Sequence, residues 1–317
     1  MPTPLRIRRL AVLAAVTAAA AAARASTAQD TALSRARQVT YSENYDPSLS
    51  PDGHSMVYIS AVAGREQLFV RSIDGREIRQ LTTDSTDHED PAWSPTGDTI
   101  AFVALHGGHA QIALVPARGG PVEVLTPADE RVIHPSWSPD GRRLAYCTDD
   151  DLAPPKKNPA SIKVLDLATR TVRVLISGGI NTYPVWSPDG RALAFRRMLG
   201  ENNSEVFVAD SSGAAARNLT NSPAFDGWPA WSPDGRRIAF ASNRGGTGDY
   251  RIFIMRADGS DVRLLASTSG RATAPKWSRD GRTVYFPVCR REENVAGCEI
   301  YAANVPPPRP ETARARD

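Results

Sequence analysis

The chain has 317 residues, of which 41% are hydrophobic and 23% are charged. This is the composition of an ordinary globular protein, and it excludes a disordered chain. Lys and Arg number 38 against 35 Asp and Glu, and four of the arginines lie within residues 1–25, which hold no acidic residue. The remainder is therefore close to neutral, which leaves nucleic-acid binding without electrostatic support.

The N-terminus has the pattern of an export signal. Three arginines within residues 6–9 precede a small and apolar run over residues 10–23, and residues 23–25 fit the small-x-small pattern of signal cleavage. The run is too short and too rich in alanine to span a bilayer. We expect residues 1–25 to be a signal peptide and residues 26–36 a linker. The mature chain is then periplasmic or secreted, with no transmembrane segment.

An eight-residue motif recurs six times along the rest of the chain. Its fullest form is x-Pro-x-Trp-Ser-Pro-Asp-Gly, where x is a variable residue, as in residues 183–190. Repeats with a period near 45 residues are typical of β-propellers, in which each repeat forms one blade. The first prolines of the six copies lie 44 to 49 residues apart and are Pro47, Pro91, Pro135, Pro184, Pro229 and Pro275.

Each repeat predicts four antiparallel strands, which we name A to D in chain order. Strand A begins at the first Pro, whose missing N–H is tolerated at the start of a strand. Ser-Pro-Asp-Gly then forms a tight turn, and runs rich in β-branched and aromatic residues follow as strands B and C. Examples are strand B over 99–103 and 237–241, strand C over 67–70 and 251–255, and strand D over 79–82 and 262–265.

The end of the chain predicts how the ring closes. Strand C of the sixth repeat, residues 299–302, is followed by three prolines and by no strand D. Residues 37–40 (Arg-Gln-Val-Thr) nearly duplicate residues 79–82 (Arg-Gln-Leu-Thr). We therefore predict an all-β, six-bladed propeller over residues 37–305, with 37–40 completing the last blade so that no edge stays exposed. Residues 306–317 are predicted to be a disordered tail.

The repeated motif resembles the Asp-Pro-x-Trp-Ser-Pro-Asp-Gly repeat of the TolB-like propellers, and similar repeats occur in tricorn and dipeptidyl-peptidase-like proteins. The resemblance covers residues 37–305 and implies a stand-alone propeller without the N-terminal domain of TolB or a peptidase domain. It also implies a binding role, because TolB docks a peptidoglycan-associated lipoprotein on its propeller. We expect an exported, non-catalytic scaffold protein, monomeric, that binds a protein of the cell envelope.

Two sets of repeated residues are expected to be structural. Five tryptophans share one slot in strand A, and a repeated slot indicates packing between neighbouring blades rather than catalysis. The turn aspartates recur in nearly every blade and have the same interpretation. The tryptophans are Trp93, Trp137, Trp186, Trp231 and Trp277, and the aspartates are Asp52, Asp140, Asp189, Asp234 and Asp280.

Binding is expected on the face that bears the D-to-A and B-to-C loops, here called the loop face, because those loops are long and varied. The opposite face bears the short A-to-B and C-to-D turns and is called the turn face. Six residues that precede the motif prolines should ring the mouth of the central channel on the loop face. They are Asp46, Asp90, His134, Tyr183, Trp228 and Ala274.

Aromatic residues near this ring suggest a rim. Tyr45 and Phe225, together with Tyr183 and Trp228, suit a protein anchor or a sugar ring. The same residues would equally serve to pack the loops onto the ring. The sequence leaves both interpretations open.

Histidines suggest a competing enzyme. His88, His106, His109 and His134 are predicted on loops of the loop face, with carboxylates beside His88, and such groups bind divalent metals. This pattern would fit a metal-assisted polysaccharide lyase or hydrolase, and a small-ligand sensor at the channel mouth is a third alternative. No nucleophile elbow, zinc-protease motif or phosphate loop is present in the sequence. Beyond this divalent metal, no cofactor is expected.

Cysteine placement agrees with export. Cys289 ends strand B of the last repeat and Cys298 opens its strand C, so hairpin pairing brings the two together. We expect a disulfide in an oxidising compartment, with reduced thiols as the alternative. Cys147 lies within strand B of the third repeat and is expected to be buried and inert.

Overall fold

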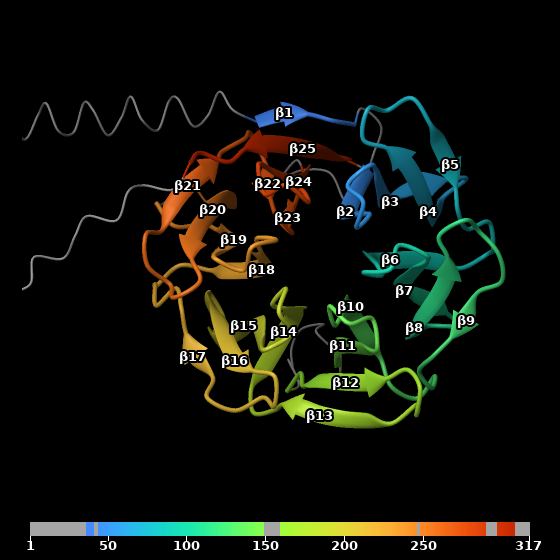
Figure 1. The fold of residues 1–317 in the computed structure, drawn as a ribbon, viewed down its shortest axis with the longest axis horizontal. Coiled ribbons are helices and arrows are strands. Elements are labelled where there is room, and N and C mark those ends of the chain that lie inside the picture. Colours follow the sequence, from blue (N-terminus) through green and yellow to red (C-terminus); the bar gives the residue numbers. More distant parts are fainter. Residues whose placement is uncertain (1–35, 41–43, 149–158, 246–247, 290–296, 308–317) are drawn as a thin grey trace, which may run out of the picture.

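The computed structural model describes residues 36–40, 44–148, 159–245, 248–289 and 297–307. These residues form six antiparallel sheets arranged radially around a central opening, with strand A of each sheet innermost and strand D outermost (Figure 1). The predicted all-β, six-bladed propeller with four-stranded blades is confirmed. No helix in this part of the chain is long and apolar enough to cross a membrane.

The blades follow one another in chain order. Blade 1 consists of β2 (Asn44–Leu49), β3 (Ser55–Val62), β4 (Arg65–Ser72) and β5 (Ile78–Gln80). Blade 2 consists of β6 (Asp87–Trp93), β7 (Thr99–His106), β8 (His109–Pro116) and β9 (Glu123–Val124). Blade 3 consists of β10 (Val132–Trp137), β11 (Arg143–Thr148), β12 (Ile162–Asp166) and β13 (Val172–Ile176).

The second half of the ring repeats this order. Blade 4 consists of β14 (Ile180–Trp186), β15 (Ala192–Gly200), β16 (Asn203–Asp210) and β17 (Arg217–Asn218). Blade 5 consists of β18 (Asp226–Trp231), β19 (Arg237–Ser242), β20 (Arg251–Arg256) and β21 (Arg263–Ala266). Blade 6 consists of β22 (Arg271–Ala272), β23 (Lys276–Trp277), β24 (Thr283–Cys289), β25 (Cys298–Asn304) and the N-terminal β1 (Ala36–Gln38).

Strand β1 closes the ring as the sequence predicts. It pairs antiparallel with β25, with Ala36 opposite Ala303 and Gln38 opposite Tyr301. The pairing continues past the strand, where the Val39 N–H donates to the Ile300 carbonyl at 2.7 Å. The first and last described segments of the chain therefore share one sheet.

The innermost strands begin earlier than the sequence predicts. In blades 1 to 5, strand A starts three or four residues before the motif Pro, and its register shifts around that Pro. In blade 6 the same interruption divides the strand into β22 and β23. A β-bulge releases a residue from the ladder, so a Pro without an N–H is accommodated inside the strand rather than at its start.

The Ser-Pro-Asp-Gly turns are held by their own side chains. In blade 1 the Ser50 hydroxyl donates to Asp52 at 2.5 Å and accepts the Ser55 N–H at 2.9 Å. Blade 2 carries Thr96 in place of the Asp, and there Asp98 accepts from Ser94 at 3.1 Å. The turn aspartates are therefore structural.

The motif tryptophans join neighbouring blades, as predicted. The Trp137 indole N–H donates to the Ala92 carbonyl of blade 2 at 2.9 Å, and the Trp277 indole donates to the Ala230 carbonyl of blade 5 at 3.0 Å. The apolar cores likewise lie between adjacent sheets, with one cluster running from blade 2 through blade 4. Cores placed between blades fix each sheet relative to the next and hold the loop face rigid.

The cysteines lie where the sequence suggested. Cys289 and Cys298 face each other across β24 and β25 and form a disulfide, while Cys147 is buried within β11. The predicted signal peptide 1–25, most of the linker 26–36 and most of the tail 306–317 lie outside the described residues.

Candidate functional site

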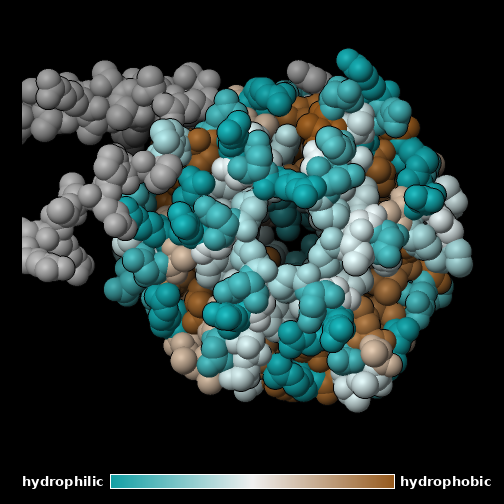
Figure 2. Space-filling view, in the orientation of Figure 1, coloured by the Kyte–Doolittle hydropathy of each residue, from teal (hydrophilic) through white to brown (hydrophobic). Residues whose placement is uncertain are grey.

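A cavity of about 250 Å³, here called the channel mouth, lies in the central channel and is lined by the middle and later residues of strand A in all six blades. The space-filling view, which has the orientation of Figure 1, shows the channel as an opening at the centre of the ring, bordered by polar and weakly polar residues (Figure 2). All six residues that precede the motif prolines line the cavity. They are Asp46, Asp90, His134, Tyr183, Trp228 and Ala274.

These six residues share an unusual backbone conformation. Each has a positive φ, between 40° and 56°, although none is glycine. The left-handed region costs an ordinary L-residue roughly 1 to 2 kcal/mol, and such outliers concentrate at functional sites. Each lies in the bulge of its strand A, where the register shift re-aims the side chain. The repeat therefore directs six side chains of different chemistry toward one axis.

One side of the mouth is acidic. Burial, followed by the neighbouring Asp90 carboxylate, raises the pKa of Asp46 to about 7. Glu89 lies beside this pair, and burial together with the Asp90 charge raises its pKa to about 7 as well. Asp90 also accepts the backbone N–H of His134 at 3.0 Å, and the His134 Nε2 atom lies 3.6 Å from the same oxygen.

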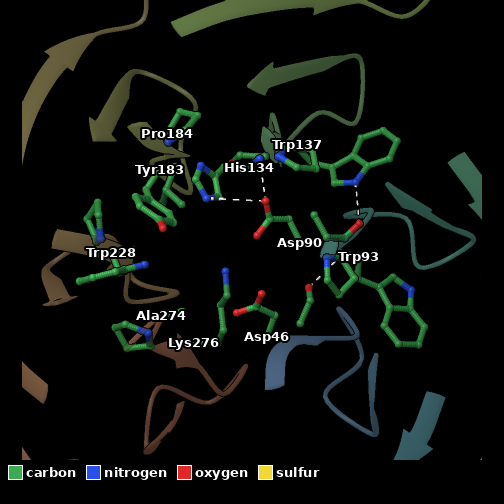
Figure 3. Close-up of a pocket in the computed structure, with 18 residues that line it drawn as sticks. Asp46, Asp90, Trp93, His134, Trp137, Tyr183, Pro184, Trp228, Ala274 and Lys276 are labelled. Atoms are coloured by element: carbon green, nitrogen blue, oxygen red, sulfur yellow. Dashed lines mark hydrogen bonds and ion pairs between the residues drawn. The ribbon is translucent and has the colours of Figure 1, made fainter. Parts of the chain in front are cut away.

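Lys276 supplies an ammonium group to the same cavity, and sequence reasoning missed it. Figure 3 shows its amino group directed between the carboxylates and the aromatic side of the mouth. Burial lowers the pKa of Lys276, while Asp46 and Asp90 partly oppose that shift. The signal was present in the motif, because the residue between Pro and Trp is Ala, Ser or Val in the other Trp-containing copies and Lys only here.

The other side of the mouth is aromatic. The rings of His134 and Tyr183 lie 3.7 Å apart between centroids, and those of Tyr183 and Trp228 lie 5.3 Å apart (Figure 3). The Arg196 guanidinium, whose residue is 7% exposed, lies 4.7 Å from the Tyr183 ring centroid and 5.5 Å from that of Trp228. Its Nε donates to Thr182 at 2.9 Å. These cation–π contacts hold the rings in place.

Arg196 was not predicted from the sequence either. It occupies a strand B slot that holds Ile59, Val103, Cys147 and Ala241 in other blades, so an arginine there contradicts the apolar pattern. That contradiction is the signal that would have revealed it.

Two residues predicted for the rim lie behind it. Tyr45 packs against the core cluster of blades 1 and 2, and it is not among the residues that line the cavity. Phe225 likewise does not line the cavity but supports Trp228, at 6.0 Å between ring centroids, and Tyr250 at 5.6 Å. These two residues therefore pack onto the ring instead of facing a ligand, which is the second of the two interpretations that the sequence left open.

The four histidines are not gathered at one place. His88 was expected on a loop, but it lies within β6, where it is fully buried against Phe102. Its Nδ1 atom is within hydrogen-bond distance, 2.9 Å, of the Thr82 hydroxyl, which also accepts the Leu68 N–H. Burial lowers the pKa of His88. The early start of strand A explains its position.

The other histidines occupy two separate places. His106 and His109 face each other at the tip of the β7–β8 hairpin. His134 is at the channel mouth, where burial lowers its pKa well below the usual value, and its Nδ1 atom lies 3.2 Å from the Cys147 sulfur. Among the described residues, no group of three or more His, Cys, Asp or Glu side chains is arranged to hold a metal.

The mouth can therefore hold a ligand that combines a flat apolar surface with polar groups. Carboxylates accept hydrogen bonds on one side, the rings of Tyr183 and Trp228 offer apolar faces on the other, and Lys276 donates between them. A preformed concave site with few convergent polar groups is typical of specific binding.

Known proteins share this architecture. A protein described as a TolB from Agrobacterium tumefaciens matches with a TM-score of 0.64 and 22% identity, over 86% of this chain and 97% of that one. TolB from Acinetobacter baumannii gives a TM-score of 0.62 and 22% identity, over 83% of this chain and 63% of that one. An oligogalacturonate lyase in complex with manganese gives 0.59 and 14%, over 86% and 93%. These likenesses show a common fold.

A comparison with curated proteins found no match. The family model described as the TolB beta propeller domain matches residues 26–153 and 119–304. These two matches overlap and cover every repeat of the motif. Because the model matches most of the sequence and the structure has the corresponding six-bladed ring, the chain belongs to the TolB beta-propeller domain family.

Proposed function

We propose that this protein is an exported, non-catalytic binding protein that holds a protein partner of the cell envelope at its channel mouth. The observation that carries the proposal is the convergence of six left-handed residues on one cavity. The conformation is common to all six blades and belongs to the fold, but the side chains that it directs into the cavity differ from blade to blade, and that variation supports a binding function for the place.

The chemistry of the mouth supports a protein segment as the occupant. Aromatic anchors beside fixed charges are the groups that dominate protein interfaces. Tyr183 and Trp228 provide the anchors, and Asp46, Asp90 and Lys276 provide charges of both signs. A cavity of about 250 Å³ suits one or two inserted side chains rather than a whole domain.

Export is supported by two features. The N-terminal pattern of residues 1–25 fits a signal peptide. The Cys289–Cys298 disulfide fits an oxidising compartment, because disulfides persist in the periplasm and outside the cell.

The experiment is a crosslinking capture from envelope extract of the source organism, using residues 26–317 as bait. The mouth variant combines Tyr183→Ala with Trp228→Ala. Ile78→Ser is the matched control, because Ile78 is 60% exposed on the outer strand β5, away from the mouth. We expect one dominant envelope protein with wild type and control, lost with the mouth variant, and crosslinks that map to mouth residues. Equal capture by all three baits would contradict the proposal.

A metal-assisted polysaccharide lyase or hydrolase is a second proposal. It is supported by the His134–Asp90 pair at the mouth. Its test is the metal content of the purified protein after dialysis, measured by mass spectrometry, with His134→Ala as the comparison. Stoichiometric metal that is lost in the variant would favour the enzyme over the scaffold.

A further inference from the structure

Arg196 departs from the pattern of the repeat. It lies on β15, strand B of blade 4, in a slot that is apolar in the other five blades, and only 7% of the residue is exposed. A charge removed from water is costly unless an opposite charge or hydrogen bonds compensate it. Within the part of the chain that the structure describes, Arg196 forms no ion pair, and its single hydrogen bond runs from Nε to Thr182. The other slots hold Ile59, Val103, Cys147, Ala241 and Pro287.

A second departure from the repeat lies directly beside Arg196. The residue before the positive-φ position of strand A is Gly227 in blade 5, and it is not glycine in any other blade. A Cβ atom on Gly227 would lie 2.8 Å from the Cδ atom of Arg196, which is too close for a real contact. Gly227 therefore gives the arginine room to reach from blade 4 to blade 5. The other blades have Tyr45, Glu89, Ile133, Thr182 and Thr273 at this position.

Three aromatic rings form a collar around the guanidinium group. The Cζ atom of Arg196 lies 4.7 Å from the ring centroid of Tyr183, 5.4 Å from that of Phe225 and 5.5 Å from that of Trp228. Cation–π contacts of this kind stabilise a positive charge, but an aromatic face does not replace the oxygen acceptors that guanidinium N–H groups bind. The collar therefore explains how the charge is tolerated while its hydrogen-bond donors stay unused.

The two Nη atoms of Arg196 are the unused donors, and they are accessible. Neither atom has a hydrogen-bond partner among the described residues. Neither is among the buried side-chain atoms that lack a partner, so the small exposed part of Arg196 includes both. Each Nη atom carries two N–H groups, and all of them lie in the plane of the guanidinium. The collar thus presents a planar set of free donors at the surface.

This set of donors lies on the loop-face side of the channel mouth. Arg196 pairs with Thr182, one residue before Tyr183 on β14, and strand A runs from the loop face toward the turn face. The charge of Arg196 reaches the mouth, because after burial it is the next cause that lowers the pKa of His134. A group bound to the Nη atoms would therefore lie near the rings of Tyr183 and Trp228, which Figure 3 shows next to each other.

We propose that Arg196 is a carboxylate-binding site, into which the protein partner inserts an aspartate or glutamate side chain. The planar donors match the two oxygens of a carboxylate, and hydrogen bonds between ionised groups are stronger than neutral ones. Arginine, tyrosine and tryptophan together are the residues that dominate protein interfaces. That the carboxylate belongs to a protein rests on the proposed function, whereas the affinity of Arg196 for a carboxylate does not.

The experiment is an NMR titration of residues 26–317 with N-acetyl-glutamate α-amide and, separately, with N-acetyl-glutamine α-amide. The two probes have the same shape and differ in the charge of one side chain. Binding is followed at the indole N–H signal of Trp228, assigned with Trp228→Phe, because this ring belongs to the collar. Ionic strength is held constant, since salt screens charged pairs. We expect the glutamate probe to bind at least tenfold more tightly than the glutamine probe.

Variants of Arg196 separate the carboxylate site from a purely structural role. Arg196→Met should abolish the preference for the glutamate probe. Arg196→Lys keeps a cation beside the rings but lacks the planar fork, so it should keep only part of the preference. Arg197→Met is the matched control, because Arg197 also contacts two aromatic rings but lies on the opposite side of β15, with its Nε bound to Asn181. It should leave the preference unchanged.

The proposal is overturned if wild type binds the two probes equally, if Arg196→Met keeps the preference, or if Arg197→Met loses it to the same extent. Tighter binding of the methyl glycoside of glucuronic acid than of the glutamate probe would overturn the assignment to a protein side chain in favour of an acidic sugar. Either failure is distinct from failure of the capture experiment, because these titrations contain no partner protein.

Discussion

At the scale of single residues, the channel mouth combines strain with buried charge. Asp46 has a φ of 47° and shares the cavity with Asp90, and its raised pKa follows first from burial and then from that neighbour. Both features lower stability relative to a relaxed, neutral residue. The opposite end of the same motif has the reverse character, because Asp52 accepts hydrogen bonds from Ser50 and from the His54 N–H, which lower its pKa.

Asp46→Asn should therefore stabilise the protein in a pH-dependent way. In the folded state the Asp46 carboxyl keeps its proton up to about pH 7, whereas in the unfolded chain it ionises near pH 4. Relative to the ionised state, the protonated Asp46 carboxyl stabilises the folded protein. That stability is fully present below pH 4 and is lost as the pH rises to about 7. We expect Asp46→Asn to raise the free energy of unfolding by about 1 to 3 kcal/mol at pH 8 and by clearly less at pH 5. Urea unfolding at both pH values measures this.

Asp52→Asn is the control of opposite sign. Its lowered pKa means that its stabilisation is present above the unfolded pKa and is lost only as the pH falls through the folded value. The variant should lose stability at both pH 5 and pH 8. If Asp46→Asn shifted stability equally at the two pH values, the assignment of a raised pKa would be wrong.

At the scale of elements, a threonine at the end of strand D fastens it to strand C. In four blades its hydroxyl accepts a backbone N–H of strand C at 2.9 to 3.0 Å, and all four threonines are buried. The N-terminal segment carries the same device, so it is bound to blade 6 as a native strand D would be. The pairs are Thr40 with Ile300, Thr82 with Leu68, Thr126 with Ile112 and Thr220 with Val206.

Thr82→Val should destabilise blade 1 through unmet hydrogen bonds. The change keeps the side-chain shape but leaves the Leu68 N–H and the His88 Nδ1 atom without this partner. We expect a loss of about 1 to 3 kcal/mol in the free energy of unfolding. Thr83→Val, at the exposed neighbouring position, should change it by less than about 0.5 kcal/mol. Similar values for the two variants in urea titrations would argue against the fastening role.

At the scale of the whole molecule, stability depends on closing the ring. Each blade buries its apolar faces against two neighbours, so an open ring would expose two sheets. The pairing of β1 with β25 is the closing contact, and it joins residues more than 260 positions apart.

Val39→Pro tests this closure. The substitution removes the N–H that donates to the Ile300 carbonyl and leaves that carbonyl without this donor, which should cost about 2 to 3 kcal/mol. Val39→Ala shortens the same side chain but keeps the N–H, so it should cost about 1 kcal/mol. Chemical unfolding followed by tryptophan fluorescence measures both. Equal losses would mean that side-chain packing, rather than the backbone pairing, holds the ring closed.

Much of the fold could be predicted from the sequence because a propeller repeats its local rules. The motif carries its turn, its inter-blade tryptophan and its spacing in every copy, and the duplicated Arg-Gln-x-Thr segment indicates the closing strand. The position of His88 could not be predicted in this way. The bulge at Pro91 allows strand A to begin before the Pro, at Asp87, and bulges leave no clear signal in strand periodicity.

The sequence by itself determined the number of blades, the strand order, the closure and the ring of six residues before the prolines, because each depends on local patterns repeated along the chain. Tertiary structure alone decided which side chains meet. Lys276 lines the cavity from blade 6, Arg196 of blade 4 lies against the rings of Tyr183 and Trp228, and Tyr45 and Phe225 pack behind the cavity. Contacts of this kind depend on distances through space, which no single repeat encodes.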